Sequence, residues 1–199
     1  MDNATAKEIA THIINVLKPA CARIEIAGSL RRGKPEVKDI EIVCVPADTR
    51  AMATFGKKRV FDSMFEEMVS DWAHIAKWSV LKNGARFKQF ESKTHGIKLD
   101  LFIVREPAQW GVIYAIRTGP ADFSHWLVTA REKGGALPEY TKVEHGGVYA
   151  YNAASDDADL LPMQEEIEFL DFLGLGWIEP RERVAHWGMF KPAAQGVAR

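Results

Sequence analysis

Two apolar segments of the chain carry acidic residues in their interiors. The segment 39–46, DIEIVCVP, places Asp39 and Glu41 two residues apart, and Asp100 interrupts the segment 97–104, IKLDLFIV. Side chains two apart on a strand leave the same face of a sheet, and an unpaired buried carboxylate is costly. Both segments therefore predict strands with one apolar face and one face on which the acids contact water or bind a partner.

Each acidic segment alone has an ordinary structural explanation. A strand with one wet face accounts for Asp39 and Glu41. An edge strand, or an ion pair with Lys98 on the same face, accounts equally well for Asp100. The residues that precede the first segment favour a more specific role.

A glycine-serine turn precedes the first acidic strand. Gly28 and Ser29 follow the alternating run RIEIAG at 23–28 and lead into a polar loop, SLRRGKPEVK, that contains Arg32. Small residues let backbone N–H groups approach phosphate oxygens, the serine hydroxyl adds a donor, and arginine offers a planar fork. Alone, this is a common turn. Followed by the acidic strand, it predicts a phosphate-binding site that faces carboxylates.

Three carboxylates beside a phosphate site match the needs of a two-cation centre. Two divalent cations about 3.5–4 Å apart can hold the attacking and leaving oxygens of an in-line displacement. Hard cations prefer oxygen ligands and leave positions open for substrate phosphates. We therefore expect Asp39, Glu41 and Asp100 to bind two Mg²⁺ ions, with Mn²⁺ as the alternative.

Hydrophobic periodicity predicts an α+β fold in two parts. Residues 1–105 are expected to form a mixed β-sheet with helices on it, and residues 106–199 a smaller helical unit with a short hairpin. Asn83-Gly84 predicts a hairpin turn, Gly119 and Gly134 are expected to end helices, and Phe61 to Trp72 carry one apolar helix face. The expected helices are 4–18, 61–72, 108–119, 121–134 and 163–174; the expected strands are 23–28, 39–46, 78–90 (a hairpin), 97–104 and a hairpin at 145–147.

Composition excludes several classes of protein. Of 199 residues, 47% are hydrophobic and 27% charged, as in soluble globular proteins, and the formal net charge is −1. Cys21 and Cys44 are too few for a disulfide framework and predict packed thiols in a reducing compartment, and no spacing suggests zinc. The sequence shows no signal peptide and no apolar run that could span a membrane, so we expect a cytoplasmic protein.

Two further groups of side chains carry expectations about surface and core. Residues 77–98 hold six basic residues against one acid, which predicts a basic face on a molecule that is otherwise nearly neutral. The six tryptophans are expected to pack in the core or between subdomains rather than to stack on bases. The basic residues are Lys77, Lys82, Arg86, Lys88, Lys93 and Lys98; the tryptophans are Trp72, Trp78, Trp110, Trp126, Trp177 and Trp187.

Several of these motifs together resemble one family. GSLRRGKPEVKDIEIV resembles the glycine-serine loop and metal-binding strand of the DNA polymerase X (polymerase-β-like) family, within the nucleotidyltransferase superfamily. KLDLFIV resembles that family's strand with the third carboxylate, and TGPADFSHWLVTAREKGGALPEY its Thr-Gly turn, following helix and Leu-x-Glu-Tyr strand. QEEIEFLDFLGLGWIEPRER resembles its closing segment. These motifs span residues 23–185 in the family's order.

The resemblance implies a fold and a set of residue roles. It implies a nucleotidyltransferase palm over 1–105 and a thumb-like subdomain over 106–199, without the amino-terminal lyase domain of larger members. Asp39 and Glu41 would bind both metals, and Asp100 the metal that activates a 3′-OH. The implied nucleotide-binding residues are Gly28, Ser29, Arg32 and Lys38 at the triphosphate, Thr118 and Gly119 at the sugar, and Ser124 on the helix that faces the nascent base pair.

The implied activity is that of a minimal DNA polymerase. The chain would add dNTPs to a DNA primer 3′-OH at gaps, in DNA repair, with a primer-template or gapped duplex as partner, and would act as a monomer. Minimal palm-plus-thumb polymerases of this kind are described for some viruses, so a viral or phage source is consistent with the resemblance. Glu41 and Ser124 stand where the family usually has Asp and Asn.

Two other functions stay open at this point. One is a template-independent nucleotidyltransferase that acts on RNA, a protein or a small molecule, since the same carboxylates would serve it. The other is a nucleotide- or DNA-binding module without turnover, for which Glu41 and Ser124 are the best support.

Overall fold

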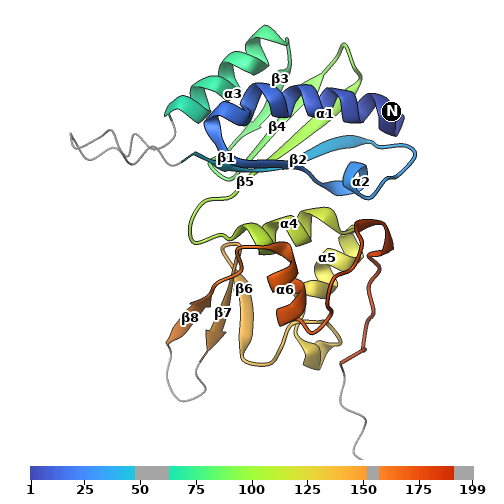
Figure 1. Ribbon diagram of the computed structural model, residues 1–199, viewed down its shortest axis with the longest axis vertical. Helices are drawn as coiled ribbons and strands as arrows, with labels where there is room; N and C mark the ends of the chain where they lie inside the picture. The colour runs from blue at the N-terminus through green and yellow to red at the C-terminus, as the bar shows by residue number, and fades with distance from the viewer. Residues whose placement is uncertain (48–62, 152–156, 191–199) are drawn as a thin grey trace, which may run out of the picture. The chain divides into compact units, whose positions relative to one another are not determined.

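The computed structural model describes residues 1–47, 63–151 and 157–190 and divides the chain into two compact units, Met1–Glu106 and Pro107–Arg199. The protein is a mixed α+β structure in which each unit has its own sheet and its own hydrophobic core (Figure 1). The expected positions near Phe61 lie outside the described residues.

The first unit is built on a five-stranded mixed sheet. Its strand order is β1-β2-β5-β4-β3, so the parallel pair β2 and β5 lies at the centre and the other neighbours pair antiparallel. The hairpin about Asn83-Gly84 is confirmed as β3 and β4. The strands are β1 (Cys21–Ile26), β2 (Asp39–Pro46), β3 (Ser79–Asn83), β4 (Phe87–Ser92) and β5 (Ile97–Ile103).

Two helices cover one face of this sheet, α1 (Asn3–Leu17) and α3 (Ser63–Ile75) (Figure 1). Their apolar side chains pack against alternate residues of the central strands, among them Ile40 and Ile42 of β2, which are fully buried. Alternation along a strand sends the intervening residues to the opposite face. The packing of Ile40 and Ile42 against the helices therefore fixes the direction of Asp39 and Glu41.

One member of the basic run at 77–98 does not lie on an exposed face, which corrects that expectation for Lys88. Lys88 points to the helix-covered side of β4 and is only 3% exposed. Its Nζ lies 2.7 Å from Glu66 of α3, and Glu66 also accepts a hydrogen bond of 3.2 Å from Arg105. Burial of a lysine requires a partner of this kind. The other five basic residues of the run are exposed.

Within its described residues, the second unit combines three α-helices with an antiparallel sheet of order β6-β7-β8. The expected hairpin about His145 and Gly146 is confirmed as β6 and β7. The hydrophobic core of the second unit contains Phe123, Trp126 and Phe169, each fully buried. The elements are α4 (Trp110–Thr118), α5 (Ala121–Leu127), β6 (Thr141–Glu144), β7 (Gly147–Tyr151), β8 (Ala158–Leu161) and α6 (Glu166–Phe172).

A buried ion pair ties the last described segment to α6. Nη1 of Arg183 lies 2.6 Å from Oε1 of Glu166, and the two side chains are 0% and 5% exposed. Arg183 also donates Nε and Nη2 to the carbonyl of Ile178. A buried charge that loses its partner is strongly destabilising, so this pair fixes the return of the chain after α6.

Several elements differ from the expectations. The loop after β1 begins as a short helix, α2 (Gly28–Arg31), and β8 was not foreseen. The helix expected to reach Gly134 ends at Leu127, because the chain turns back there: N–H of Ala136 donates to the carbonyl of Trp126, and Ala130 bridges Leu137. Gly134, at φ 86°, ends only the short helix η3 (Arg131–Lys133). Four of the six tryptophans are buried, and Trp177 and Trp187 are about half exposed.

Both cysteines are free thiols, with Cys44 buried in the first core and Cys21 half-buried beside it. A hydrogen bond from Cys44 lowers the pKa of Cys21, while burial raises that of Cys44. Among the described residues, the structure contains no helix with the length and apolar character that a membrane crossing needs.

Candidate active site

Asp39, Glu41 and Asp100 lie on one face of the first sheet, opposite α1 and α3. β2 and β5 pair in parallel with Glu41 directly beside Asp100, and Asp39 beside Lys98. Residues that pair across a sheet point to the same side, and all three carboxylates are half-buried. The three acids from separate stretches of the sequence thus share one surface.

Gly28 gives the carboxylate of Glu41 its position. Gly28 adopts φ +61°, and a Cβ placed on it would lie 1.6 Å from Oε2 of Glu41. The N–H of Ala27 also donates to the carbonyl of Glu41 at 2.8 Å, which ties the turn to β2. Glycine is required at this position both for its backbone conformation and for the space that the carboxylate occupies.

Gln89 engages the third carboxylate. Gln89 lies opposite Asp100 in the β4–β5 pairing, and its Nε2 donates to Oδ1 of Asp100 at 2.8 Å. An amide donor supports a half-buried carboxylate without neutralising its charge. The negative charge of Asp100 therefore acts on its neighbours.

Asp39 is the acid most affected by this arrangement. Burial, followed by repulsion from Asp100, raises the pKa of Asp39 above its ordinary value of 3.8, while Arg32 and Lys38 oppose the rise. Two acids that repel each other in a half-buried position form a site where a cation would be stabilised. Arg32 and Lys38 are thus cationic groups that act on Asp39.

Ser29 presents a polar atom without a partner. Its Oγ is buried and has no hydrogen-bond partner among the described residues. Buried hydroxyl groups are normally satisfied, so an orphan of this kind is a reason to consider an absent ligand. Ser29 stands in α2, directly after Gly28, next to the carboxylate face.

The three carboxylates do not form a ready metal-ligand set. Within residues 1–47, 63–151 and 157–190, no group of three or more His, Cys, Asp or Glu side chains is arranged to hold a metal ion. Glu41 instead lies against Gly28, and Asp100 is held by Gln89. The donor chemistry still suits a hard divalent cation, because all three side chains offer oxygen and Asp39 and Asp100 repel each other.

A shallow cleft of about 540 Å³ opens beside Asp39. Its lining includes three exposed lysines, Lys38, Lys93 and Lys98, together with Asp39 and Glu91. Lys98 pairs across the sheet with Asp39 on one side and with Glu91 on the other. The cleft therefore combines positive charge with the edge of the carboxylate face, as an anionic substrate would need.

The three predicted residues of the second unit lie at the junction of α4 and α5. Thr118 is fully buried, and the hydroxyl of Ser124 donates to the carbonyl of Ile116 at 2.5 Å. Gly119 ends α4, and a Cβ there would lie 2.4 Å from Cδ1 of Phe123. In this structure Ser124 and Gly119 hold two helices together, and their role toward a nucleotide stays a prediction.

Sequence reasoning missed two contributors to this face. Gln89 was overlooked because its relevance appears only once β4 is known to pair with β5 in this register. Lys93 was read only as one of a run of charges, although its place in the turn between β4 and β5 brings it to the cleft. The signal available for Gln89 was its position after Asn83-Gly84, which puts it within the returning strand of the hairpin.

No protein-family model matches the chain, and no curated protein matches it.

Proposed function

We propose that the chain is a nucleotidyltransferase with the polymerase-β-like palm fold, and that it is a minimal DNA polymerase of family X. The observation that supports it best is the shared face of Asp39, Glu41 and Asp100 on adjacent parallel strands, next to the Gly28-Ser29 turn. A sheet of order β1-β2-β5-β4-β3 with two helices on the opposite face is compatible with this fold class.

The proposed reaction adds a dNTP to the 3′-OH of a DNA primer. The hydroxyl oxygen attacks the α-phosphate and gives up its proton to solvent. The bond from the α-phosphorus to the oxygen that bridges it to the β-phosphate breaks, and pyrophosphate leaves with the electron pair of that bond. Arg32 offers charge to the triphosphate, and the Oγ of Ser29 offers a hydrogen bond that is otherwise unused. Lys38, Lys93 and Lys98 line the neighbouring cleft, where they would attract the phosphates of nucleic acid.

Asp39, Glu41 and Asp100 are the residues that would hold two divalent cations, Mg²⁺ or Mn²⁺. When bound, such cations would neutralise the carboxylates and lower the charge on the phosphate oxygens. Gln89 would keep Asp100 oriented, and Gly28 would keep space for Glu41. Burial and then repulsion from Asp100 raise the pKa of Asp39, and a bound cation would relieve that repulsion.

Two measurements test the proposal. Extension of a one-nucleotide-gapped duplex with each dNTP and rNTP, in Mg²⁺ or Mn²⁺, is expected for the wild-type chain and expected to fall at least about 100-fold in Asp100→Asn. The matched control is Asp71→Asn, an exposed aspartate of α3. Mn²⁺ binding, followed by electron paramagnetic resonance, should weaken in the first variant only.

The outcomes separate the alternatives. Wild-type-like extension by a folded Asp100→Asn protein would overturn the assignment. Incorporation that ignores the template would favour a transferase acting on RNA, a protein or a small molecule. A second candidate, a binding module without turnover, is favoured by the hydrogen bond of Gln89 to Asp100 and the contact of Glu41 with Gly28, which leave no ready ligand set. It predicts dNTP binding without pyrophosphate release.

A further inference from the structure

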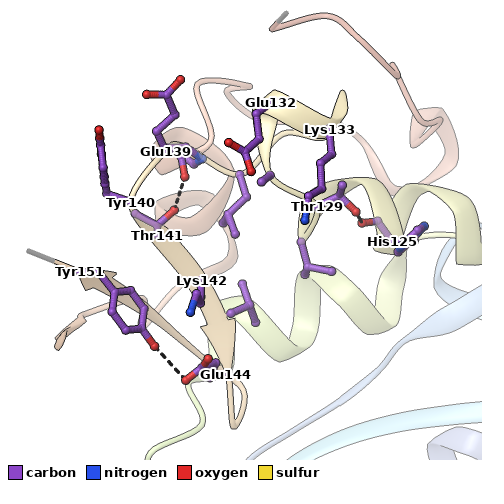
Figure 2. A pocket seen from close by; sticks show the side chains of 15 residues that line it. His125, Thr129, Glu132, Lys133, Glu139, Tyr140, Thr141, Lys142, Glu144 and Tyr151 are labelled. Atoms are coloured by element: carbon purple, nitrogen blue, oxygen red, sulfur yellow. Dashed lines mark hydrogen bonds between the residues drawn. The ribbon is translucent and has the colours of Figure 1, made fainter. Parts of the chain in front are cut away.

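A cleft of about 900 Å³ lies in the second unit, between β6 and the segment that runs from the end of α5 through η3 (Figure 2). Val128, Leu137 and Val143 contribute apolar side chains to its lining, and all four residues of β6 line it. The cleft is therefore bounded along one side by the full length of a strand.

β6 is an edge strand with outward backbone groups. The sheet order β6-β7-β8 puts it at one side, and among the described residues no strand pairs with its outer edge. The hairpin turn consists of His145 and Gly146, both at positive φ, so Glu144 and Gly147 form the hydrogen-bonded pair that flanks the turn. Alternation then directs the N–H and C=O of Thr141 and Val143 away from β7, at the outer edge of the sheet.

Two opposite charges flank Val143 on the exposed face of the same strand. Lys142 and Glu144 are exposed, whereas Val143 packs against the core of the unit. Tyr151 contacts both charged side chains: its hydroxyl donates to Oε2 of Glu144 at 2.9 Å, and Nζ of Lys142 lies 4.5 Å from its ring centre (Figure 2). The two charges are thus held on one face, two residues apart.

We propose that β6 pairs antiparallel with β6 of a second copy of this chain, about a two-fold axis that passes between the two Val143 residues. Val143 of each copy would exchange both backbone hydrogen bonds with Val143 of the partner subunit. The two three-stranded sheets would join into one continuous sheet. Natural proteins protect exposed strand edges, and pairing between copies is one way in which such an edge is satisfied.

The charges of Lys142 and Glu144 favour a second copy of this chain as the strand that pairs with β6. An antiparallel partner centred on Val143 places its own residues so that Lys142 faces Glu144 of the partner subunit, and Glu144 faces Lys142 of the partner subunit. Opposite charges in direct cross-strand positions are favourable and like charges are unfavourable. The sequence Lys-Val-Glu is therefore complementary to itself when reversed, and the interface is self-complementary as a two-fold contact must be.

This inference does not depend on the proposed catalytic function, and it departs from the expectation of a monomer. A contact of one short strand predicts a weak dimer that forms as the protein concentration rises. Sedimentation equilibrium of the whole chain over a range of concentrations measures the dimer dissociation constant. Lys142→Glu alone and Glu144→Lys alone each place two like-charge pairs in the interface, and each should raise that constant on the order of tenfold.

Two further arms make the test specific to β6. The double variant Lys142→Glu/Glu144→Lys restores complementarity and should dimerise like the wild-type chain. A mixture of the two single variants should form mixed dimers although each alone is weakened, because one strand then carries two acids and the other two lysines. Lys7→Glu and Glu8→Lys, exposed changes of the same charge on α1, are the controls and should leave the constant unchanged.

Three results would overturn the proposal. The first is a wild-type chain that stays monomeric at all accessible concentrations. The second is a dimer that is insensitive to either single charge reversal, which would place its interface elsewhere. The third is a double variant that fails to recover while its circular dichroism spectrum matches that of the wild-type chain.

Discussion

Glu41 and Asp100 lie directly beside each other on β2 and β5, although they are 59 positions apart in the sequence. Their strands run parallel, so the connection between them must cross over, and the intervening chain supplies α3, β3 and β4. Gln89 of the neighbouring strand β4 donates a hydrogen bond to Asp100, and Gly28 leaves space for the carboxylate of Glu41. The carboxylate face thus depends on long-range strand pairing for its assembly.

Gly28→Ala should destabilise the chain more than Gly33→Ala. Both glycines have positive φ, 61° and 69°, and an alanine there costs about 1–2 kcal/mol in the free energy of unfolding. Only at Gly28 would the new methyl group displace Glu41, since no atom lies within 4 Å of a Cβ at Gly33. Urea unfolding of both variants measures the difference. Equal losses would show that the contact with Glu41 has no energetic role.

The pKa of Asp39 should respond in opposite directions to two substitutions. Asp100→Asn removes a repelling charge and should lower that pKa, whereas Arg32→Gln removes an attracting charge and should raise it further. Carbon-detected NMR titration of the Asp39 carboxyl group gives both values. A pKa that is unchanged in both variants would contradict the electrostatic coupling described here.

The raised pKa of Asp39 also predicts how the free energy of unfolding changes with pH. The pKa of Asp39 in the folded chain is raised above its ordinary value of 3.8. Ionisation of Asp39 therefore lowers the free energy of unfolding. This loss is absent below pH 3.8 and is complete once the pH has risen through the folded pKa. Asp39→Asn should therefore be more stable than the wild-type chain at pH 7, and the gain should vanish below pH 3.8. Unfolding free energies at several pH values measure this difference. A variant that is less stable than the wild-type chain at pH 7 would contradict it.

Substitutions of Lys88 and Lys98 should differ in their effect on DNA binding, although both residues belong to the basic run. Lys98→Met removes an exposed charge from the cleft beside Asp39 and, under the proposed function, should weaken DNA binding and reduce the salt dependence by about one charge. Lys88→Met changes a buried residue paired with Glu66 and should leave DNA binding unaltered. Fluorescence anisotropy with a labelled gapped duplex at several salt concentrations compares them. Equal losses of affinity would place Lys88 on the binding surface after all.

Arg183→Ala should lower the free energy of unfolding of the second unit by about 3–5 kcal/mol, because it leaves the buried carboxylate of Glu166 without its cation. The double change Arg183→Met/Glu166→Leu should cost less, since it removes both charges. Arg181→Ala is the control, because its pair with Glu182 is exposed and such pairs contribute about 1 kcal/mol or less. Intrinsic tryptophan fluorescence, to which Trp177 beside Arg183 contributes, follows the unfolding. A loss for Arg183→Ala no larger than that for Arg181→Ala would contradict a structural role for the pair.

Local patterns predicted most elements of the fold. The alternation of β2, the Asn83-Gly84 hairpin and the end of α4 at Gly119 each depend on residues close in sequence, and the structure agrees with them. The overlong helix after Pro120 shows the limit of this reasoning. Residues 128–134 have a helix-compatible sequence, but the bridge of Ala130 to Leu137 competes for the same backbone groups and prevails.

The candidate site was predictable only where it depends on residues that are close in sequence. Strand alternation indicated that Asp39 and Glu41 share a face, and the structure agrees. The positive φ of Gly28 was not predicted. The parallel pairing that brings Asp100 beside Glu41, and the approach of Gln89, depend on strand order, which short-range periodicity does not encode. Lys88 could not be separated from the other basic residues until its partner on α3 was known.

β2 serves the hydrophobic core and the carboxylate face with the same run of residues. Its isoleucines hold α1 and α3, and the acids between them face the other way. Deletion or insertion of one residue within this strand would turn isoleucines toward water and acids into the core at once. Evolution could therefore exchange side chains along β2 one at a time, but could alter its length only by losing the hydrophobic core and the carboxylate face together.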